Sequence, residues 1–270
     1  MGYIDTHAHY LSKQYNKDRK EVLNSVFNNG VSAIIECGTD EYYNKKILDF
    51  TKQFDNVYGL IGFDPVHLDG LSDNVLNNFI EMLKDKKIVG IGEIGLDYYR
   101  ADKDKWKEQE KWFRYQLDIA RKYDLPVCIH SRDAKDDTLR ILKDFGEYKG
   151  VIHCFSYDIE SMKELVKLGY SFGVGGTSTY KNNVSVIEAI KEMPLDRIVL
   201  ETDAPYLSPT EVRGTRNQSD NIKYVISNLS RLLGVLKEEI IEITRENSLR
   251  LYNKIKIGSN PIRNSIVPQY

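Results

Sequence analysis

The sequence has 270 residues, of which 41% are apolar and 29% are charged, a balance typical of globular proteins that excludes disorder of the whole chain. The formal net charge of −2 excludes a protein that binds nucleic acid through a general positive field, but not an enzyme that holds phosphate with local groups. The three cysteines, Cys37, Cys128 and Cys154, are odd in number and form no CxxC pair, so no disulfide framework is expected.

We expect a cytoplasmic protein that does not contact a membrane. Reduced thiols are the simplest interpretation of the three cysteines. No basic-then-apolar leader precedes the first predicted strand, and no apolar run approaches the ~18 residues that a transmembrane helix needs.

Short apolar, β-branched runs alternate with longer amphipathic ones along the chain. Near-continuous apolar runs of this kind are typical of a parallel sheet that is covered on both faces. The predicted strands are residues 2–9, 31–39, 57–65, 88–96, 126–131, 151–155, 171–176 and 198–205.

Helical patterns fill the intervals between these strands. Residues 104–124 mostly keep a 3.6-residue period, and Asp158 precedes a helix that Gly169 ends. The remaining helix starts are predicted at Ser72, Asp133 and Asn183, and a last pair of helices covers about 219–233 and 237–254.

Eight strands that are each followed by a helix predict an α/β fold, a (β/α)8 TIM barrel, as a single domain over residues 1–254. A doubly wound sheet is the competing fold. Its phosphate-binding glycine loop is missing, because the glycine-rich runs at 90–95 and 173–177 lack a helix start in the right place. Residues 255–270 carry two prolines and no period, so they are predicted to form a peripheral C-terminal tail.

His7 and His9 stand two residues apart in the first predicted strand, so their side chains point to the same side. That geometry suits a metal chelate, and it also suits an ordinary polar strand end. His67, in the loop after the third strand, is interpreted as a surface residue or a neighbour of the site.

The other ionisable residues extend the pattern of the first strand. His130, His153 and Asp203 end the fifth, sixth and eighth predicted strands, and Glu93 lies in the fourth among glycines. The C-terminal strand ends of a TIM barrel carry its active site, so six potential ligands converge on one face.

Four imidazoles and two carboxylates suit Zn, Mn or Fe, and suit Mg less well because Mg prefers oxygen ligands. Six ligands are too many for one catalytic metal with an open position and about right for two metals that share one carboxylate. The strand order assigns His7, His9 and Asp203 to one metal and His130 and His153 to the other. Glu93 lies between the two groups and is the predicted bridge.

Five motifs in chain order resemble the TatD family of metal-dependent deoxyribonucleases: D-T-H-A-H, G-E-I-G-L-D-Y-Y, P-V-C-I-H-S-R, V-I-H-C-F-S and L-E-T-D-A-P-Y-L. The resemblance covers about residues 2–254, and R-G-T-R-N at 213–217 adds to it. It implies a barrel, two divalent cations (Mg, Mn or Zn) and hydrolysis of phosphodiester bonds in DNA as the substrate. It also implies the same ligand assignment: His7, His9 and Asp203 on one metal, His130 and His153 on the other, and Glu93 as the bridge.

One residue departs from the family pattern. The chain has Asp64 where the family usually has a histidine, in G-F-D-P after the third strand. A carboxylate at that position repels phosphate unless it is protonated or paired. His67, three residues on, is a possible replacement for the missing histidine.

We predict catalytic roles for Asp203 and Glu93, with Asp203 accepting a proton from the attacking water. Glu201 is predicted to orient a ligand histidine, although a buried salt bridge fits it equally well. Arg132, Arg213 and Arg216 are candidates for substrate phosphate, and each also fits a surface ion pair. The tyrosines predicted on top-face loops, which could stack on bases, are Tyr98, Tyr99 and Tyr180.

Three alternatives use the same residues. A barrel amidohydrolase would act on a cyclic amide or ester, but the subtype with a bridging lysine is disfavoured because the fourth strand offers Glu93 instead. An aminoacyl-ester hydrolase acting on charged tRNA would use the metals to polarise a carbonyl group. A metal-binding module without activity fits poorly, because it rarely needs six ligands around an open position.

Overall fold

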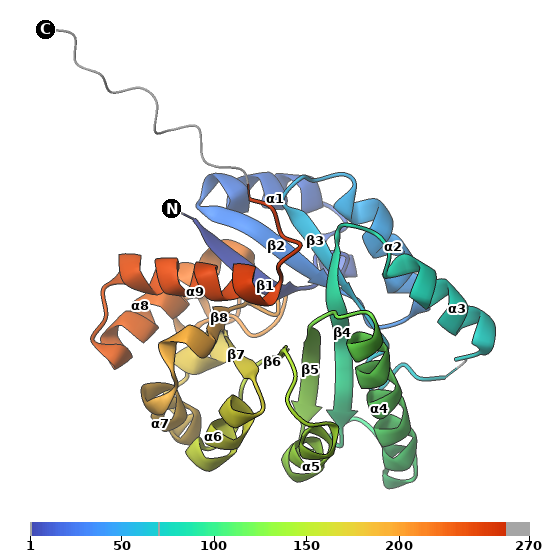
Figure 1. Ribbon diagram of the computed structural model, residues 1–270. Helices are drawn as coiled ribbons and strands as arrows, with labels where there is room; N and C mark the ends of the chain where they lie inside the picture. Colours follow the sequence, from blue (N-terminus) through green and yellow to red (C-terminus); the bar gives the residue numbers. More distant parts are fainter. Residues whose placement is uncertain (1, 70, 258–270) are drawn as a thin grey trace, which may run out of the picture.

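The computed structural model describes residues 2–69 and 71–257. Eight parallel strands form one sheet in the order of the sequence, and Figure 1 shows the helices arranged around the outside of the strands. The strands are β1 (Tyr3–Ala8), β2 (Val31–Cys37), β3 (Val57–Ile61), β4 (Ile88–Asp97), β5 (Val127–Arg132), β6 (Gly150–Ile152), β7 (Tyr170–Val174) and β8 (Ile198–Leu200).

Nine α-helices lie in the described part of the chain: α1 (Arg19–Asn28), α2 (Glu41–Thr51), α3 (Asp73–Met82), α4 (Trp106–Lys122), α5 (Lys135–Phe145), α6 (Ile159–Lys167), α7 (Val184–Glu192), α8 (Ile222–Leu233) and α9 (Lys237–Leu251). The predicted starts at Ser72 and Asp158 are confirmed, since each side chain accepts a hydrogen bond from a backbone amide in the first turn. Asp133 precedes its helix by two residues, because its φ of 54° is not helical.

The barrel is closed between its first and last strands by a few contacts rather than by a full ladder. Ala8 and Ala204 form a parallel bridge, and the His9 amide donates to the Ala204 carbonyl at 2.7 Å. The Asp203 amide donates to the carbonyl of His7 at 2.9 Å. The predicted TIM-barrel fold is confirmed, and its closure brings the segment after β8 beside the end of β1.

Three predicted strands run three or more residues too far at their C-terminal ends: β3, β6 and β8 end at Ile61, Ile152 and Leu200 instead of at 65, 155 and 205. At the rim of the barrel the chain leaves its neighbouring strand, and its backbone groups bond outside the regular ladder. His153 therefore follows β6 directly, and Asp203 lies three residues beyond β8, so neither residue ends a strand as predicted.

Apolar side chains fill the barrel interior and its N-terminal end, which lies opposite the C-terminal rim. Ile4, Ile35 and Leu60 from the strands pack in one cluster with Tyr252 and Ile255, which follow α9. The described part of the predicted tail, residues 255–257, lies against this end, where the Lys256 amide donates to the Tyr58 hydroxyl. The rest of that prediction, residues 258–270, lies outside the described residues. Because the described residues pack this end of the barrel, a site is expected at the C-terminal rim.

Buried side-chain amides of α4 bind the backbone at the C-terminal ends of β3 and β4. Gln116 on α4 accepts from the Phe63 amide at 2.8 Å and donates to the Phe63 carbonyl at 3.0 Å. Gln109, two turns earlier, makes the same pair of bonds with Asp97. These bonds replace the ladder partners that the rim lacks, and they hold the ends of both strands against α4.

Gln116→Leu is expected to lower the free energy of unfolding by about 2–4 kcal/mol, because it leaves the buried amide and carbonyl of Phe63 without partners. Urea denaturation followed by circular dichroism measures the loss. Gln53→Leu is the control, because Gln53 is exposed and donates only to the Asp49 carbonyl of its own helical segment. Equal midpoints for the two variants would contradict the prediction.

No helix in residues 2–69 and 71–257 has the length and apolar character needed to cross a membrane.

Candidate metal centre

Six side chains meet at the C-terminal rim of the barrel. His7 lies in β1 and His9 one residue after it, Glu93 lies in β4 and His130 in β5. His153 and Asp203 come from the segments that follow β6 and β8. All six residues that the sequence analysis selected as metal ligands are therefore brought together.

The first group surrounds the two histidines of the N-terminal motif. The Nε2 atoms of His7 and His9 are 3.1 Å apart, and both face Asp203 Oδ1, at 3.7 and 3.3 Å respectively. Two imidazole nitrogens at this separation, with an acid oxygen opposite, have the spacing of ligands on one cation.

Glu93 faces both groups of histidines through different oxygens. Its Oε2 lies 3.8 Å from His7 Nε2 and 3.9 Å from His9 Nε2. Its Oε1 lies 2.7 Å from His130 Nδ1 and 4.0 Å from His153 Nε2. Each oxygen of Glu93 therefore faces a different group of histidines.

The two groups of ligands lie in direct contact with each other. The rings of His7 and His153 are stacked, with centroids 3.5 Å apart and planes at 15°. His153 Nε2 is also 3.9 Å from Asp203 Oδ1, so this oxygen faces three of the imidazole rings. The site is thus one continuous cluster of nitrogen and oxygen atoms that could hold a metal ion.

The charge state of the cluster fits a site for cations. Burial alone would raise the pKa of Glu93, but the neighbouring histidines, His130 foremost with His7 and His153, together hold this pKa well below its usual range. Burial lowers the pKa of His9 and His130, but their carboxylate neighbours outweigh this effect and raise each value to about 9. Anionic carboxylates that draw protons onto nearby imidazoles would equally attract a divalent cation, which replaces those protons on binding.

Two carboxylates hold the outer nitrogens of the second pair of histidines. Asp97 Oδ2 lies 3.0 Å from His130 Nε2 in a hydrogen bond, and Glu201 Oε1 lies 3.0 Å from His153 Nδ1 in an ion pair without hydrogen-bond geometry. Such contacts fix the tautomer and the ring orientation of a ligand histidine. The sequence analysis identified Glu201 and missed Asp97, although strand alternation places Asp97 on the same face of β4 as Glu93.

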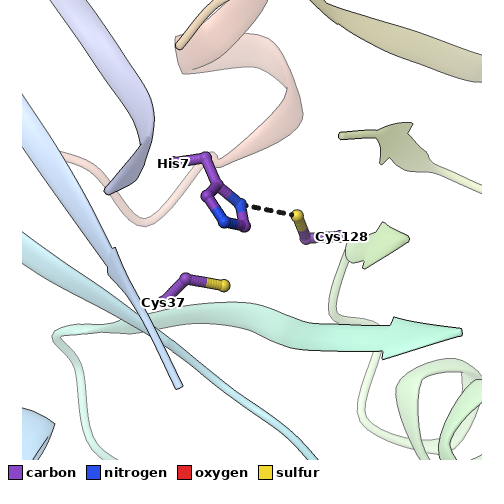
Figure 2. A group of neighbouring side chains, drawn as sticks. All are labelled: His7, Cys37 and Cys128. Carbon is purple, nitrogen blue, oxygen red and sulfur yellow. Dashed lines mark hydrogen bonds between the residues drawn. The ribbon is translucent and has the colours of Figure 1, made fainter. Parts of the chain in front are cut away.

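The first pair of histidines has different partners. His9 Nδ1 lies 3.1 Å from the Cys37 carbonyl oxygen, and His7 Nδ1 lies 3.3 Å from Cys128 Sγ. Figure 2 shows the His7 ring with the buried thiols of Cys37 and Cys128 beside it. Burial raises the pKa of the Cys37 thiol well above its usual range, so this thiol is uncharged at neutral pH.

Two residues at the site have strained backbones. Asp203 has a φ of 57°, and Cys154, directly after His153, has a φ of 46°. A left-handed conformation is uncommon for residues other than glycine, and it persists only where the surrounding contacts impose it. At Asp203 these contacts include the amide bond to His7, which turns its carboxylate toward the histidines.

The three candidate arginines lie in different environments. Arg216 donates to both oxygens of Asp18, at 2.9 and 2.6 Å, and lies over the ring of Tyr15. The Arg213 guanidinium lies over Tyr180, 4.1 Å from the ring centroid. The Arg132 guanidinium lies over Tyr99, at 3.8 Å. Arg132 and Arg213 thus remain the better candidates for substrate phosphate, because Arg216 is already engaged.

Asp64 is a paired carboxylate. It is 7% exposed, and its Oδ1 lies 2.8 Å from His67 Nδ1 and accepts from the Val66 amide at 3.0 Å. The repulsion of phosphate expected from this position is therefore reduced whenever His67 is protonated. The hydrogen bond to Asp64 raises the pKa of His67.

We predict that His67 titrates above the ordinary histidine pKa of about 6.5, and that Asp64→Asn returns it to that value. Because the folded-state pKa is raised, the pair stabilises the protein below about pH 6.5, and this stabilisation is lost as the pH rises through the higher value. NMR titration of the His67 ring protons measures its pKa in the wild type and in Asp64→Asn. Asp69→Asn, at an exposed neighbouring position, is the control. A wild-type pKa at or below 6.5 would contradict the prediction.

The sequence and the fold match known proteins over almost the whole chain. A sequence model described as "TatD related DNase" matches residues 4–253. The uncharacterized metal-dependent hydrolase YabD of Bacillus subtilis is 36% identical over 251 residues, which cover 92% of this chain and 98% of that protein. The crystal structure of YjjV, a TatD homologue from Escherichia coli K12, has a TM-score of 0.86 at 31% identity and covers 93% of this chain and 98% of its own.

Proposed function

The chain belongs to the TatD-related DNase family of metal-dependent hydrolases, and from this membership we propose that it hydrolyses phosphodiester bonds in DNA with two divalent cations. The observation that carries the proposal is the position of Glu93, whose two oxygens face two different groups of histidines. In this proposal Glu93 is the shared ligand, His7, His9 and Asp203 hold one cation, and His130 and His153 hold the other.

Divalent cations bound here would lower the pKa of a water molecule toward neutrality and stabilise the charge that develops on a phosphoryl oxygen. Asp203 is proposed to accept the proton of this water, because its side chain stands at the centre of the histidine cluster and is 18% exposed. Glu201 and Asp97 hold the rings of His153 and His130 so that their inner nitrogens face Glu93.

Substrate phosphate would lie beside Arg132 or Arg213, whose guanidinium groups are held over exposed or half-exposed tyrosine rings. The metals expected are Mg, Mn or Zn. The four imidazole nitrogens favour Mn or Zn over Mg, because Mg prefers oxygen ligands.

The test is nuclease activity on single- and double-stranded DNA after EDTA treatment and metal add-back. We expect activity to vanish in EDTA, to return with one of the three cations, and to be lost in Glu93→Ala. Glu160→Ala, at an exposed glutamate of α6, is the matched control. Full activity in EDTA or in Glu93→Ala would falsify the proposal. Parallel assays on aminoacyl-tRNA and on cyclic amides test whether the same site attacks a carbonyl instead.

A further inference from the structure

A cavity of about 500 Å³ opens beside the metal centre, at the C-terminal ends of β4, β5 and β6. Six of its lining residues carry the argument that follows: Tyr98, Trp106, Ser131, Arg132, Lys135 and Tyr157. The cavity lies next to the centre along the chain, because Ser131 directly follows His130 and Tyr98 directly follows Asp97. None of these six residues is among the proposed metal ligands.

One wall of the cavity is aromatic. The rings of Tyr98 and Trp106 are stacked face to face, with centroids 3.8 Å apart and planes at 12°. Hydrogen bonds hold both rings: the Tyr98 hydroxyl donates to Asp137 at 2.8 Å, and the Trp106 indole donates to the Ala101 carbonyl at 3.3 Å. Because the two rings cover each other, a nucleobase would pack against the part of this fixed pair that lines the cavity.

The inner wall carries hydroxyl groups. Tyr157 is only 5% exposed, and its hydroxyl faces the hydroxyls of Ser131 and Thr138 but forms no hydrogen bond of good geometry within residues 2–69 and 71–257. Ser131 and Thr138 are bonded to each other at 2.8 Å. A buried donor left without a partner is costly, and a ligand that accepts a hydrogen bond from Tyr157 would remove that cost.

The charges of the cavity do not suit a phosphate deep inside it. Asp133, Asp136 and Asp137 contribute three carboxylates to the lining, and Lys135 is paired with Asp158 at 2.7 Å. Arg132 differs from Lys135, because among the described residues of the lining it forms no short ion pair. Its guanidinium lies over the ring of Tyr99 instead. The interior therefore favours an uncharged group with hydrogen-bonding edges, and a phosphate fits at Arg132.

We propose that this cavity is a subsite for one unpaired nucleoside next to the scissile phosphate, an inference that rests on the function proposed above. The base lies against Tyr98 and Trp106, its polar edge accepts from Tyr157, and the flanking phosphate lies at Arg132.

The first test measures binding without catalysis. The chain has two tryptophans, so Trp112→Phe leaves Trp106 as the only one. In EDTA, 5′-dAMP is expected to change Trp106 fluorescence saturably, whereas inorganic phosphate and deoxyribose 5-phosphate are not. Adding Tyr157→Phe is expected to raise the Kd for dAMP about tenfold. No saturable change with dAMP, or the same change with the compounds that lack a base, overturns the proposal.

The second test uses single-stranded oligonucleotides with an abasic residue on either side of the cleaved bond. At one of the two positions the loss of the base is expected to lower kcat/KM about tenfold, mainly through KM. Trp106→Ala should show the same tenfold loss of kcat/KM on the intact strand. This variant should also cleave the intact and the abasic strand equally well. Trp112→Phe should behave as wild type on both strands. Equal cleavage of intact and abasic strands overturns the subsite but leaves the nuclease proposal standing. Binding of dAMP at Trp106 without cleavage of any DNA supports the subsite and rejects the nuclease.

Discussion

Asp203→Asn is expected to lower kcat for DNA by about 10³- to 10⁴-fold while the protein stays folded and keeps most of its metal. Asp203 Oδ1 faces the Nε2 atoms of His9, His7 and His153 at 3.3, 3.7 and 3.9 Å. An asparagine retains an oxygen that can face these groups, but it cannot accept a proton from the attacking water. The variant thus separates proton transfer from metal binding.

The measurements are steady-state kinetics on single-stranded DNA and metal content by mass spectrometry. Asp196→Asn is the matched control, because this carboxylate precedes β8 at the opposite end of the strand and is 67% exposed. We expect the control to match wild type in both measurements. Retention of more than about a tenth of wild-type kcat by Asp203→Asn would show that another group accepts the proton.

Gly173→Ala is expected to lower metal affinity and kcat/KM by about 10- to 100-fold, although residue 173 contacts no substrate in the proposed mechanism. A Cβ atom at Gly173 would lie 2.0 Å from Glu201 Oε2. Glu201 is 1% exposed, and its Oε1 accepts from the Cys154 amide at 2.7 Å and pairs with His153. The carboxylate cannot retreat without losing these contacts, so the ring of His153 would lose its orientation.

Calorimetric titration with Mn²⁺ measures the affinity, and Glu201→Gln tests the same contact without steric conflict. The glutamine variant should show a smaller loss, since it keeps the volume of the side chain and removes only its charge. Ser171→Ala, two residues earlier on the same face of β7, is the control. If Gly173→Ala binds Mn²⁺ as the wild type does, Glu201 does not position His153.

The strand ends show where sequence patterns lose information. I-V-L-E-T-D-A-P reads as one strand because most of its residues are apolar or β-branched, yet β8 ends at Leu200. Beyond that residue, the amides of Thr202 and Asp203 donate to the His7 carbonyl of β1 rather than continuing the ladder with β7. Closure of the barrel redirects these bonds, and no local pattern records which strand becomes the new neighbour.

By itself, the sequence determined the eight-fold alternation, the barrel and the family, because hydrophobic periodicity and short motifs are local properties of the chain. It also identified the six side chains that meet at the rim, since strand order brings the ends of parallel strands together. Only the tertiary structure decided two of their outer partners, Asp97 and the thiol of Cys128, and showed that the histidine beside Glu201 is His153. It also decided that Arg216 pairs with Asp18 and that a cavity lies beside His130. These contacts join residues far apart in the chain at distances of a few ångströms, and such distances are set by side-chain packing, which no periodicity in the sequence encodes.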